Sequence, residues 1–164
     1  MALPARKLRR SAVKNIVRVP STKSGLSEFG EYKSILVESI LESQYCLHLE
    51  FDQSVAQYFP QPKTFQIALR DGQVVRYIPD FEVLYTSGAR EYIEVKPHKF
   101  ASSPRAVELF TCFQSAVQVE RSRFKVVDEY AIPRQLKLID VEKILRKEAC
   151  LREIYTWIAL HIGA

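Results

Sequence analysis

Residues 77–97 read Y-I-P-D-F-E-V-L-Y-T-S-G-A-R-E-Y-I-E-V-K-P, and this stretch decides the fold. Apolar and polar residues alternate on both sides of Thr86-Ser87-Gly88, which predicts two β-strands joined by a tight turn. Asp80 opens the first strand directly after a proline, and Glu94-Val95-Lys96 closes the second. The stretch therefore predicts a hairpin with charged residues at one end.

The spacing of the charged residues in this hairpin places their side chains close together at one end of it. Side chains two apart on a strand point to the same face, so Glu94 and Lys96 point together while Ile93 and Val95 point into the core. The residue count around the turn makes Asp80 and Glu94 cross-strand neighbours. Two adjacent carboxylates repel unless positive charge lies between them. Lys96 supplies part of that charge, and a hard divalent cation, Mg²⁺ or Mn²⁺, would supply the rest.

Two interpretations of the hairpin stand side by side at this point. A metal ion held there would polarise a phosphoryl oxygen and lower the pKa of a bound water, with Lys96 orienting that water. This is the chemistry of phosphodiester hydrolysis. An ordinary hairpin with a solvated, charged face explains the same residues.

A helix is predicted just before the hairpin region, from Ser39 to about Asp52. Its apolar residues recur at helical spacing, which indicates one buried face. Ser39 is a natural N-cap, and Glu42 three positions later completes a capping box. Capping alone is a sufficient reason for Glu42, although its carboxylate is also the right kind of group to complete a metal shell.

The remaining pattern predicts an α/β fold with a mixed sheet. We expect an extended arm over 1–31, a strand or lead-in over 32–37, a connection over 52–62 and three strands in an antiparallel meander. A helix follows from Ser103-Pro104 to about residue 121, then a parallel strand over 124–127 and a last helix over 140–161. The strands of the meander are expected at 64–69, 73–78 and 81–85, with 91–96 completing the hairpin.

Charge is concentrated at the N-terminus. Residues 1–23 hold seven Lys and Arg and no acid, whereas the whole chain has a net charge of +5. A basic arm on a body of opposite sign suggests attraction to a polyanion such as DNA, although a solvated terminus is the simpler interpretation. The candidate DNA contacts are Arg6, Lys7, Arg9, Arg10, Lys14 and, beyond the hairpin, Lys99.

The three cysteines and the apolar runs indicate in which cellular compartment the protein is found. Cys46, Cys112 and Cys150 are widely spaced, which disfavours both a disulfide framework and a zinc site and makes a reducing cytosol the default. No apolar run approaches the roughly 18 residues of a membrane span, and the N-terminus lacks the apolar segment of a signal peptide. We therefore expect a cytoplasmic protein with no membrane partner.

Five sequence blocks together resemble the TnsA family, the endonuclease subunits of heteromeric, targeted DNA transposons. They are S-I-L-E at 39–42, L-x-L-E-F-D at 47–52, Q-P at 61–62, R-Y-I-P-D-F at 76–81 and I-E-V-K-P at 93–97. The resemblance covers about residues 32–130. The basic segment R-K-L-R-R-S-A-V-K-N at 6–15 is further similar to TnsA proteins of CRISPR-associated transposons.

This resemblance implies a restriction-endonuclease-like fold of the PD-(D/E)XK type, a mixed β-sheet flanked by α-helices. The implied activity is cleavage of the 5′ ends of a transposon in the bacterial cytoplasm, while a TnsB-type transposase acts on the 3′ ends. The implied catalytic residues are Glu42, Asp80, Glu94 and Lys96, with the three acids as Mg²⁺ ligands. A TnsC-type AAA+ regulator is a further implied partner, and residues 131–164 are the candidate contact.

Two rival functions remain open on the sequence. The first is a stand-alone PD-(D/E)XK nuclease of repair or restriction, which would cut DNA without partners. The second is a non-catalytic, DNA-binding assembly subunit whose acidic residues are vestigial.

Overall fold

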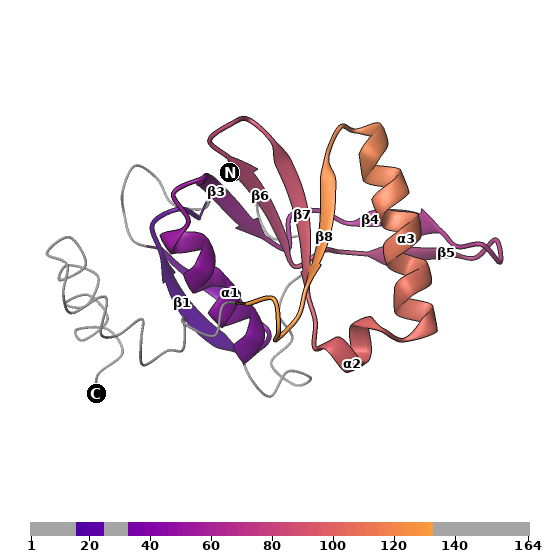
Figure 1. Cartoon of the computed structure of the whole chain (residues 1–164), viewed down its shortest axis with the longest axis horizontal. Coiled ribbons are helices and arrows are strands. Elements are labelled where there is room, and N and C mark those ends of the chain that lie inside the picture. The colour runs from indigo at the N-terminus through magenta and orange to yellow at the C-terminus, as the bar shows by residue number, and fades with distance from the viewer. Residues whose placement is uncertain (1–15, 25–32, 133–164) are drawn as a thin grey trace, which may run out of the picture.

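A four-stranded mixed sheet lies at the centre of the computed structural model, which describes residues 16–24 and 33–132 (Figure 1). A helix covers each of its two faces. The sheet contains, in spatial order, β3 (Val55–Pro60), β6 (Phe81–Tyr85), β7 (Arg90–Val95) and β8 (Arg123–Val127). The helices are α1 (Ile40–Phe51), α2 (His98–Ala101) and α3 (Pro104–Val119). Two separate ribbons complete the fold, β1 (Val17–Ser21) with β2 (Lys33–Val37), and β4 (Phe65–Ala68) with β5 (Val74–Tyr77).

Strand β7 is buried on both of its faces, and its alternation builds the two layers of the core. Ile93 and Val95 belong to a cluster that includes Leu49 of α1. Tyr92, which precedes Ile93 and points to the opposite face of the strand, belongs to a second cluster with Phe113 of α3. The predicted burial of Ile93 and Val95 is therefore confirmed. The interpretation of the opposite face as solvated is wrong, because α3 packs over it.

The predicted hairpin of β6 and β7 is confirmed. The strands pair antiparallel, with Phe81 opposite Ile93 and Leu84 opposite Arg90. Gly88 in the turn has a φ of +82°, a left-handed conformation that glycine adopts without steric cost. The predicted return of the chain through a parallel strand is also confirmed, since β8 pairs parallel with β7 after α3.

Both helix starts match the sequence prediction. The side chain of Ser39 accepts a hydrogen bond from the backbone N–H of Glu42 at the start of α1. Ser103 caps α3 in the same way, and Pro104 occupies the first helical position. A mixed sheet flanked by helices is thus observed, as the restriction-endonuclease-like expectation requires.

The predicted three-stranded meander is wrong in one step. Its first two strands pair antiparallel, as β4 and β5, but β5 does not pair with β6. Strand β5 pairs with β4 alone, and the residues 78–80 separate it from β6. The second neighbour of β6 is β3, which lies in the segment 52–62 predicted as a connection. A register shift between Val55 and Gln57 breaks the alternation that would have revealed β3. Pro60 ends β3 at the sheet edge, where proline is tolerated.

The arm predicted over 1–31 is wrong in part, because it contains β1. Val19 of β1 is 4% exposed and belongs to the same core cluster as α1. Residues 17–21 are therefore part of the folded body. The basic residues 6–14 and the helix predicted over 140–161 lie outside the described residues.

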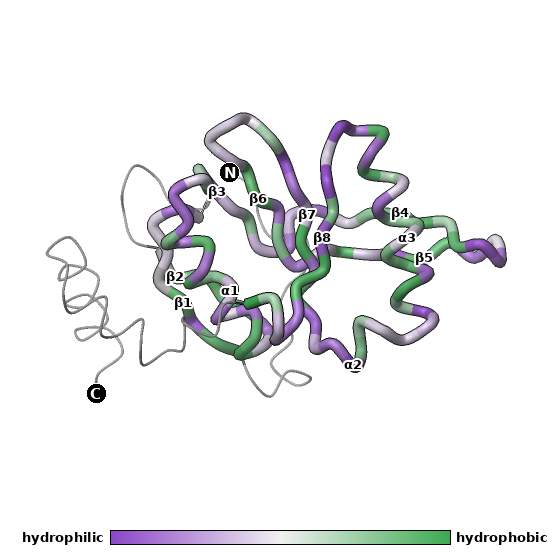
Figure 2. The backbone as a smooth tube through the Cα atoms, in the orientation of Figure 1, coloured by the Kyte–Doolittle hydropathy of each residue, from purple (hydrophilic) through white to green (hydrophobic). Residues whose placement is uncertain are grey.

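The hydropathy of the chain follows these layers. Figure 2 shows hydrophobic colouring along parts of the strands and of α1 and α3, whereas the turn between β4 and β5 is hydrophilic. None of the helices in the described ranges combines the length and apolar character that crossing a bilayer requires.

Candidate active site

Asp80 and Glu94 face each other where β6 begins and β7 ends. Continuing the β6–β7 register by one pair beyond Phe81 and Ile93 places Asp80 opposite Glu94. Oδ2 of Asp80 also accepts a hydrogen bond of 2.8 Å from the backbone N–H of Val95. The residue count around the turn predicted that these two carboxylates are cross-strand neighbours, and the structure brings them together.

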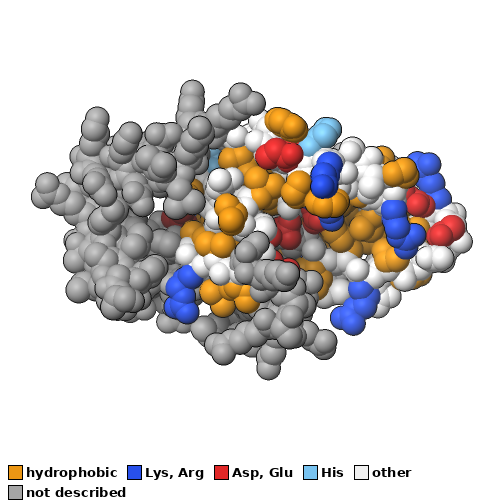
Figure 3. Space-filling model, turned by 90° about the horizontal axis from the view of Figure 1, so that it is seen from below, with side chains coloured by type: hydrophobic (Ala, Val, Ile, Leu, Met, Phe, Trp, Pro, Cys, Tyr) orange, Lys and Arg blue, Asp and Glu red, His pale blue; other side chains and the backbone are white. Residues whose placement is uncertain are grey.

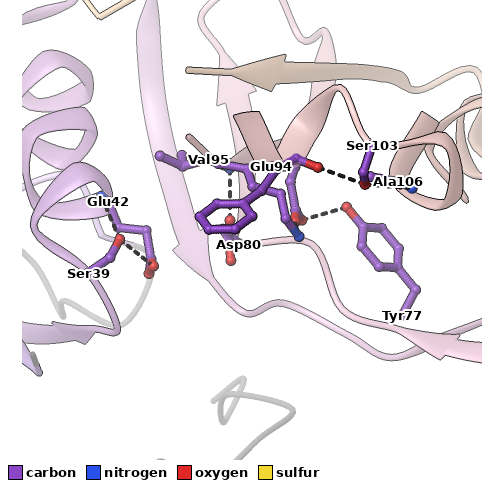
Figure 4. A network of polar contacts seen from close by, with 10 residues as sticks. Ser39, Glu42, Tyr77, Asp80, Glu94, Val95, Ser103 and Ala106 are labelled. Atoms are coloured by element: carbon purple, nitrogen blue, oxygen red, sulfur yellow. Dashed lines mark hydrogen bonds and ion pairs between the residues drawn. The ribbon is translucent and has the colours of Figure 1, made fainter. Parts of the chain in front are cut away.

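The Glu94 carboxylate is held by two neighbours in a buried position (Figure 4). The hydroxyl of Tyr77 donates a 2.7 Å hydrogen bond to its Oε2. The ammonium group of Lys96 lies 3.4 Å from its Oε1. Sequence reasoning missed Tyr77, although the signal was present. It lies three residues before Asp80, within the block R-Y-I-P-D-F.

Lys96 combines a fixed backbone with a partly exposed ammonium group. Its backbone N–H donates a 2.9 Å hydrogen bond to the carbonyl of Val127, which ties the ends of β7 and β8 together. Its side chain is 38% exposed, whereas that of Glu94 is 10% exposed. The ammonium nitrogen also lies 5.8 Å from the centre of the Phe110 ring. The charge of Lys96 is therefore accessible to a substrate that approaches this end of the sheet.

Glu42 approaches the same place from α1 and also caps that helix. Its Oε1 accepts a 2.7 Å hydrogen bond from the Ser39 hydroxyl, and its Oε2 accepts one of 3.0 Å from the backbone N–H of Glu38. Figure 4 shows Glu42 and Ser39 on one side of Asp80, and Tyr77 on the other. The predicted capping box is confirmed in part: Ser39 caps the Glu42 backbone, and the Glu42 carboxylate accepts from the Glu38 backbone in place of the Ser39 backbone.

The pKa values of Asp80 and Glu42 are both raised in this site. Burial raises the pKa of Asp80 well above its usual range, and repulsion from Glu94 and Glu42 raises it further. Burial likewise raises the pKa of Glu42, against hydrogen bonds that favour its charged form. Lys96 lowers the pKa of Asp80, but its effect is the smallest of these. The site therefore has an excess of negative charge.

Both signs of charge are present on the side of the molecule that Figure 3 shows. Acidic side chains lie near the middle of the view and also at its right end, where several Lys and Arg side chains lie beside them.

The oxygen donors of this site match part of what a hard cation needs. Mg²⁺ commonly takes only one or two protein carboxylates and completes its shell with water and substrate phosphates. Asp80 and Glu94 supply two such oxygen donors side by side. Within 16–24 and 33–132, no cluster of three or more His, Cys, Asp and Glu side chains is close enough to hold an ion unaided. The pair therefore fits a substrate-completed Mg²⁺ shell, and Glu42 stands beside it.

The candidate DNA contacts are only in part described. Lys99 lies on α2, three residues after Lys96, and its ammonium group is 4.8 Å from the centre of the exposed Phe100 ring. Arg6, Lys7, Arg9, Arg10 and Lys14 lie outside the described residues.

A comparison with known families places the sheet and most of the site within one of them. The family model described as the TnsA-like endonuclease N terminal matches residues 52–138, more than half of the chain. The matched range contains Asp80, Glu94 and Lys96, and it begins after Glu42. A search among curated proteins finds no match.

Proposed function

This chain belongs to the TnsA-like endonuclease family, and we propose that it is a Mg²⁺- or Mn²⁺-dependent DNA endonuclease that cuts the 5′ ends of a transposon. The observation that carries this proposal is the meeting of Asp80, Glu94 and Lys96 at the ends of two neighbouring strands. An acid pair beside an accessible lysine matches the PD-(D/E)XK pattern.

Each residue has a role that follows from its position. Asp80 and Glu94 hold the metal ion, and Glu42 assists them from α1. A bound Mg²⁺ or Mn²⁺ would polarise a phosphoryl oxygen and lower the pKa of a water molecule. Lys96 orients the attacking water or stabilises the negative charge that develops on the phosphate.

Tyr77 acts through Glu94. Because its hydroxyl donates to Oε2 of Glu94, it fixes the orientation of that carboxylate and leaves the remaining lone pairs for a ligand. The excess negative charge around Asp80 raises the free energy of the metal-free site and so favours the binding of a cation.

The proposed setting is a heteromeric transposase complex in the bacterial cytoplasm. A TnsB-type transposase would cut and join the 3′ ends, and a TnsC-type AAA+ regulator would contact residues 131–164. The basic segment 6–15 supports the further proposal that the transposon is CRISPR-associated, and its charges would bind the DNA backbone with salt-dependent affinity.

The decisive experiment is cleavage of a labelled duplex by the full chain, with and without TnsB-type and TnsC-type proteins. We expect 5′-strand cleavage only in the complex with Mg²⁺ present, and a loss of at least about 100-fold for Lys96→Ala. Lys125→Ala, an exposed lysine on β8, is the matched control. Robust cutting by the lone protein would indicate a stand-alone nuclease. Unchanged cleavage by Lys96→Ala and Asp80→Ala would indicate a non-catalytic assembly subunit.

A further inference from the structure

The ribbon of β4 and β5 has an outer face that the proposed cleavage chemistry leaves unused. Its side chains alternate along both strands, and the inner set packs against α3. The outer set is exposed. It consists of Gln66, Ala68, Val74 and Arg76.

The pairing of the two strands arranges this outer face into two rows. Gln66 lies directly opposite Arg76, and Ala68 lies directly opposite Val74. Within the described residues, no hydrogen bond or ion pair engages the side chain of Gln66 or Arg76. Val74 is 61% exposed, a high value for valine. The face thus joins one pair of free hydrogen-bonding side chains to one apolar pair.

These residue types are the ones that read DNA base edges. Arginine donates two hydrogen bonds to O6 and N7 of guanine, glutamine pairs with N6 and N7 of adenine, and small apolar side chains contact the thymine methyl group. The major groove is about 12 Å wide and admits a two-stranded β-ribbon. Four residues of strand span about 13 Å, so the ribbon matches the groove in size.

We propose that the outer face of the β4–β5 ribbon, Gln66, Ala68, Val74 and Arg76, enters the major groove of duplex DNA and reads base pairs beside the cleaved phosphate. The inference rests on the proposed endonuclease function and adds to it the surface that selects the sequence.

The ribbon is anchored to the proposed cleavage site. This anchoring limits the distance between the scissile phosphate and the base pairs that the ribbon contacts. Tyr77 at the end of β5 donates a hydrogen bond to Glu94. Arg76 precedes Asp80 by four residues, so at most about 14 Å of backbone separates them. With about 3.4 Å between successive base pairs, this corresponds to about four base pairs. The base pairs read by Arg76 and Gln66 therefore lie within about five of the scissile phosphate.

The charge of the ribbon suits DNA better than a protein partner. Residues 63–76 contain Lys63, Arg70 and Arg76 against the single acid Asp71. Figure 1 shows the β4–β5 turn extending beyond α3, and Figure 3 shows several Lys and Arg side chains at that end of the molecule, with acidic side chains beside them. A protein interface would favour a buried aromatic or aliphatic anchor, whereas the outer face offers only Val74 as a large apolar side chain.

The test is a selection from duplexes with a randomised segment, using the full chain with Ca²⁺ in place of Mg²⁺. We expect the unmodified protein to enrich specific base pairs by roughly 10-fold. The variant Gln66→Ala/Arg76→Ala should lose this enrichment and keep its melting temperature, because both side chains are exposed. Gln114→Ala/Arg123→Ala, which removes the same two side-chain types elsewhere, should keep the enrichment.

Two further measurements distinguish base reading from charge alone. Arg76→Lys keeps the charge but lacks the bidentate fork, so we expect it to lose a guanine preference. Replacing guanine by 7-deazaguanine in the selected duplex removes the N7 acceptor and should weaken binding of the unmodified protein but not of Arg76→Ala. An unmodified protein that enriches no base pair, or a double variant that enriches as strongly, overturns the inference.

The outcomes separate this inference from the proposed function. Lys96→Ala should lose cleavage and keep the base-pair enrichment. If Lys96→Ala cuts normally while the ribbon variant loses enrichment, the cleavage assignment fails and the ribbon assignment stands. If the ribbon variant keeps the enrichment but no longer binds a TnsB-type protein, the face is a protein-docking surface and the inference is wrong.

Discussion

The hydroxyl of Tyr77 donates a 2.7 Å hydrogen bond to Oε2 of Glu94, and this bond links the β4–β5 ribbon to the central sheet. The Tyr77 ring packs edge-on against Phe113 of α3, with 4.6 Å between the ring centres. Lys96 holds the other oxygen of Glu94. The orientation of one proposed metal ligand therefore depends on the position of a ribbon outside its own sheet.

The first prediction concerns Tyr77→Phe, which removes the hydroxyl and preserves the packing of the ring. We expect cleavage by the assembled complex to fall about 10-fold, because Glu94 loses the partner that orients it. The free energy of unfolding should fall by about 1 kcal/mol, the usual cost of one lost hydrogen bond. Single-turnover cleavage and urea unfolding measure the two effects.

The matched control for Tyr77→Phe is Tyr85→Phe. Tyr85 donates a 2.6 Å hydrogen bond to Oε2 of Glu91, at the opposite end of β7 from Glu94. We expect a similar loss of stability and no change in cleavage. Equal losses of cleavage in both variants would mean that Tyr77 acts through stability alone.

A second prediction concerns Asp80→Asn in the metal-free protein. Asparagine can still accept the hydrogen bond from Val95 but removes one of three charges that repel each other in a buried place. In EDTA we therefore expect the free energy of unfolding to rise by about 1 kcal/mol, while cleavage is abolished. Asp71→Asn, an exposed change in a turn, should leave both unchanged. A metal-free Asp80→Asn protein that is less stable would contradict the repulsion.

A third prediction concerns the two described cysteines. Cys46 is fully buried in the core beside α1, and burial raises the pKa of its thiol. Cys112 on α3 is partly exposed. Since the thiolate is the reactive form, iodoacetamide at pH 8 should modify Cys112 at least about 100-fold faster than Cys46. Peptide mass spectrometry measures both rates, and in guanidinium chloride they should converge. Equal rates in the native protein would place Cys46 outside the core.

Local signals account for the parts of the fold that sequence predicted. The Ser39 and Ser103 caps, the proline after Ser103 and the glycine in the β6–β7 turn all act within a few residues. The same holds for the pairing of Asp80 with Glu94, because a tight turn fixes the register of the strands it joins. Periodicity and turn chemistry suffice for such features.

The parts that sequence did not predict depend on contacts between distant segments. Strand β3 pairs with β6 across more than twenty residues, and its bulge hides the alternation. Tyr77 resembles any inward-facing strand residue until the ribbon packs and brings its hydroxyl to Glu94. No local pattern indicates that β5 and β6 belong to different sheets.

The last prediction separates the two roles of Glu42. Ser39→Ala removes the hydroxyl that accepts from the Glu42 backbone and donates to its carboxylate. We expect the free energy of unfolding to fall by about 1 kcal/mol, the usual cost of a lost N-cap, while metal affinity is retained. Glu42→Gln keeps an oxygen acceptor for Ser39 or the backbone but removes the charge. It should therefore change stability little and weaken Mn²⁺ binding about 10-fold.

Calorimetric Mn²⁺ titration and urea unfolding of both variants decide between cap and ligand. If Glu42 only caps the helix, Ser39→Ala should lower stability and neither variant should change Mn²⁺ affinity. If Glu42 assists the metal ion, Ser39→Ala should lower only stability, because it removes a hydrogen bond at a helix start. Glu42→Gln should then lower mainly the Mn²⁺ affinity, because it removes a charge beside Asp80. Glu38→Gln, an acid four residues before Glu42 and outside the helix, is the matched control. A loss of affinity as large for Glu38→Gln as for Glu42→Gln would mean that general negative charge, and not the Glu42 carboxylate, attracts the ion.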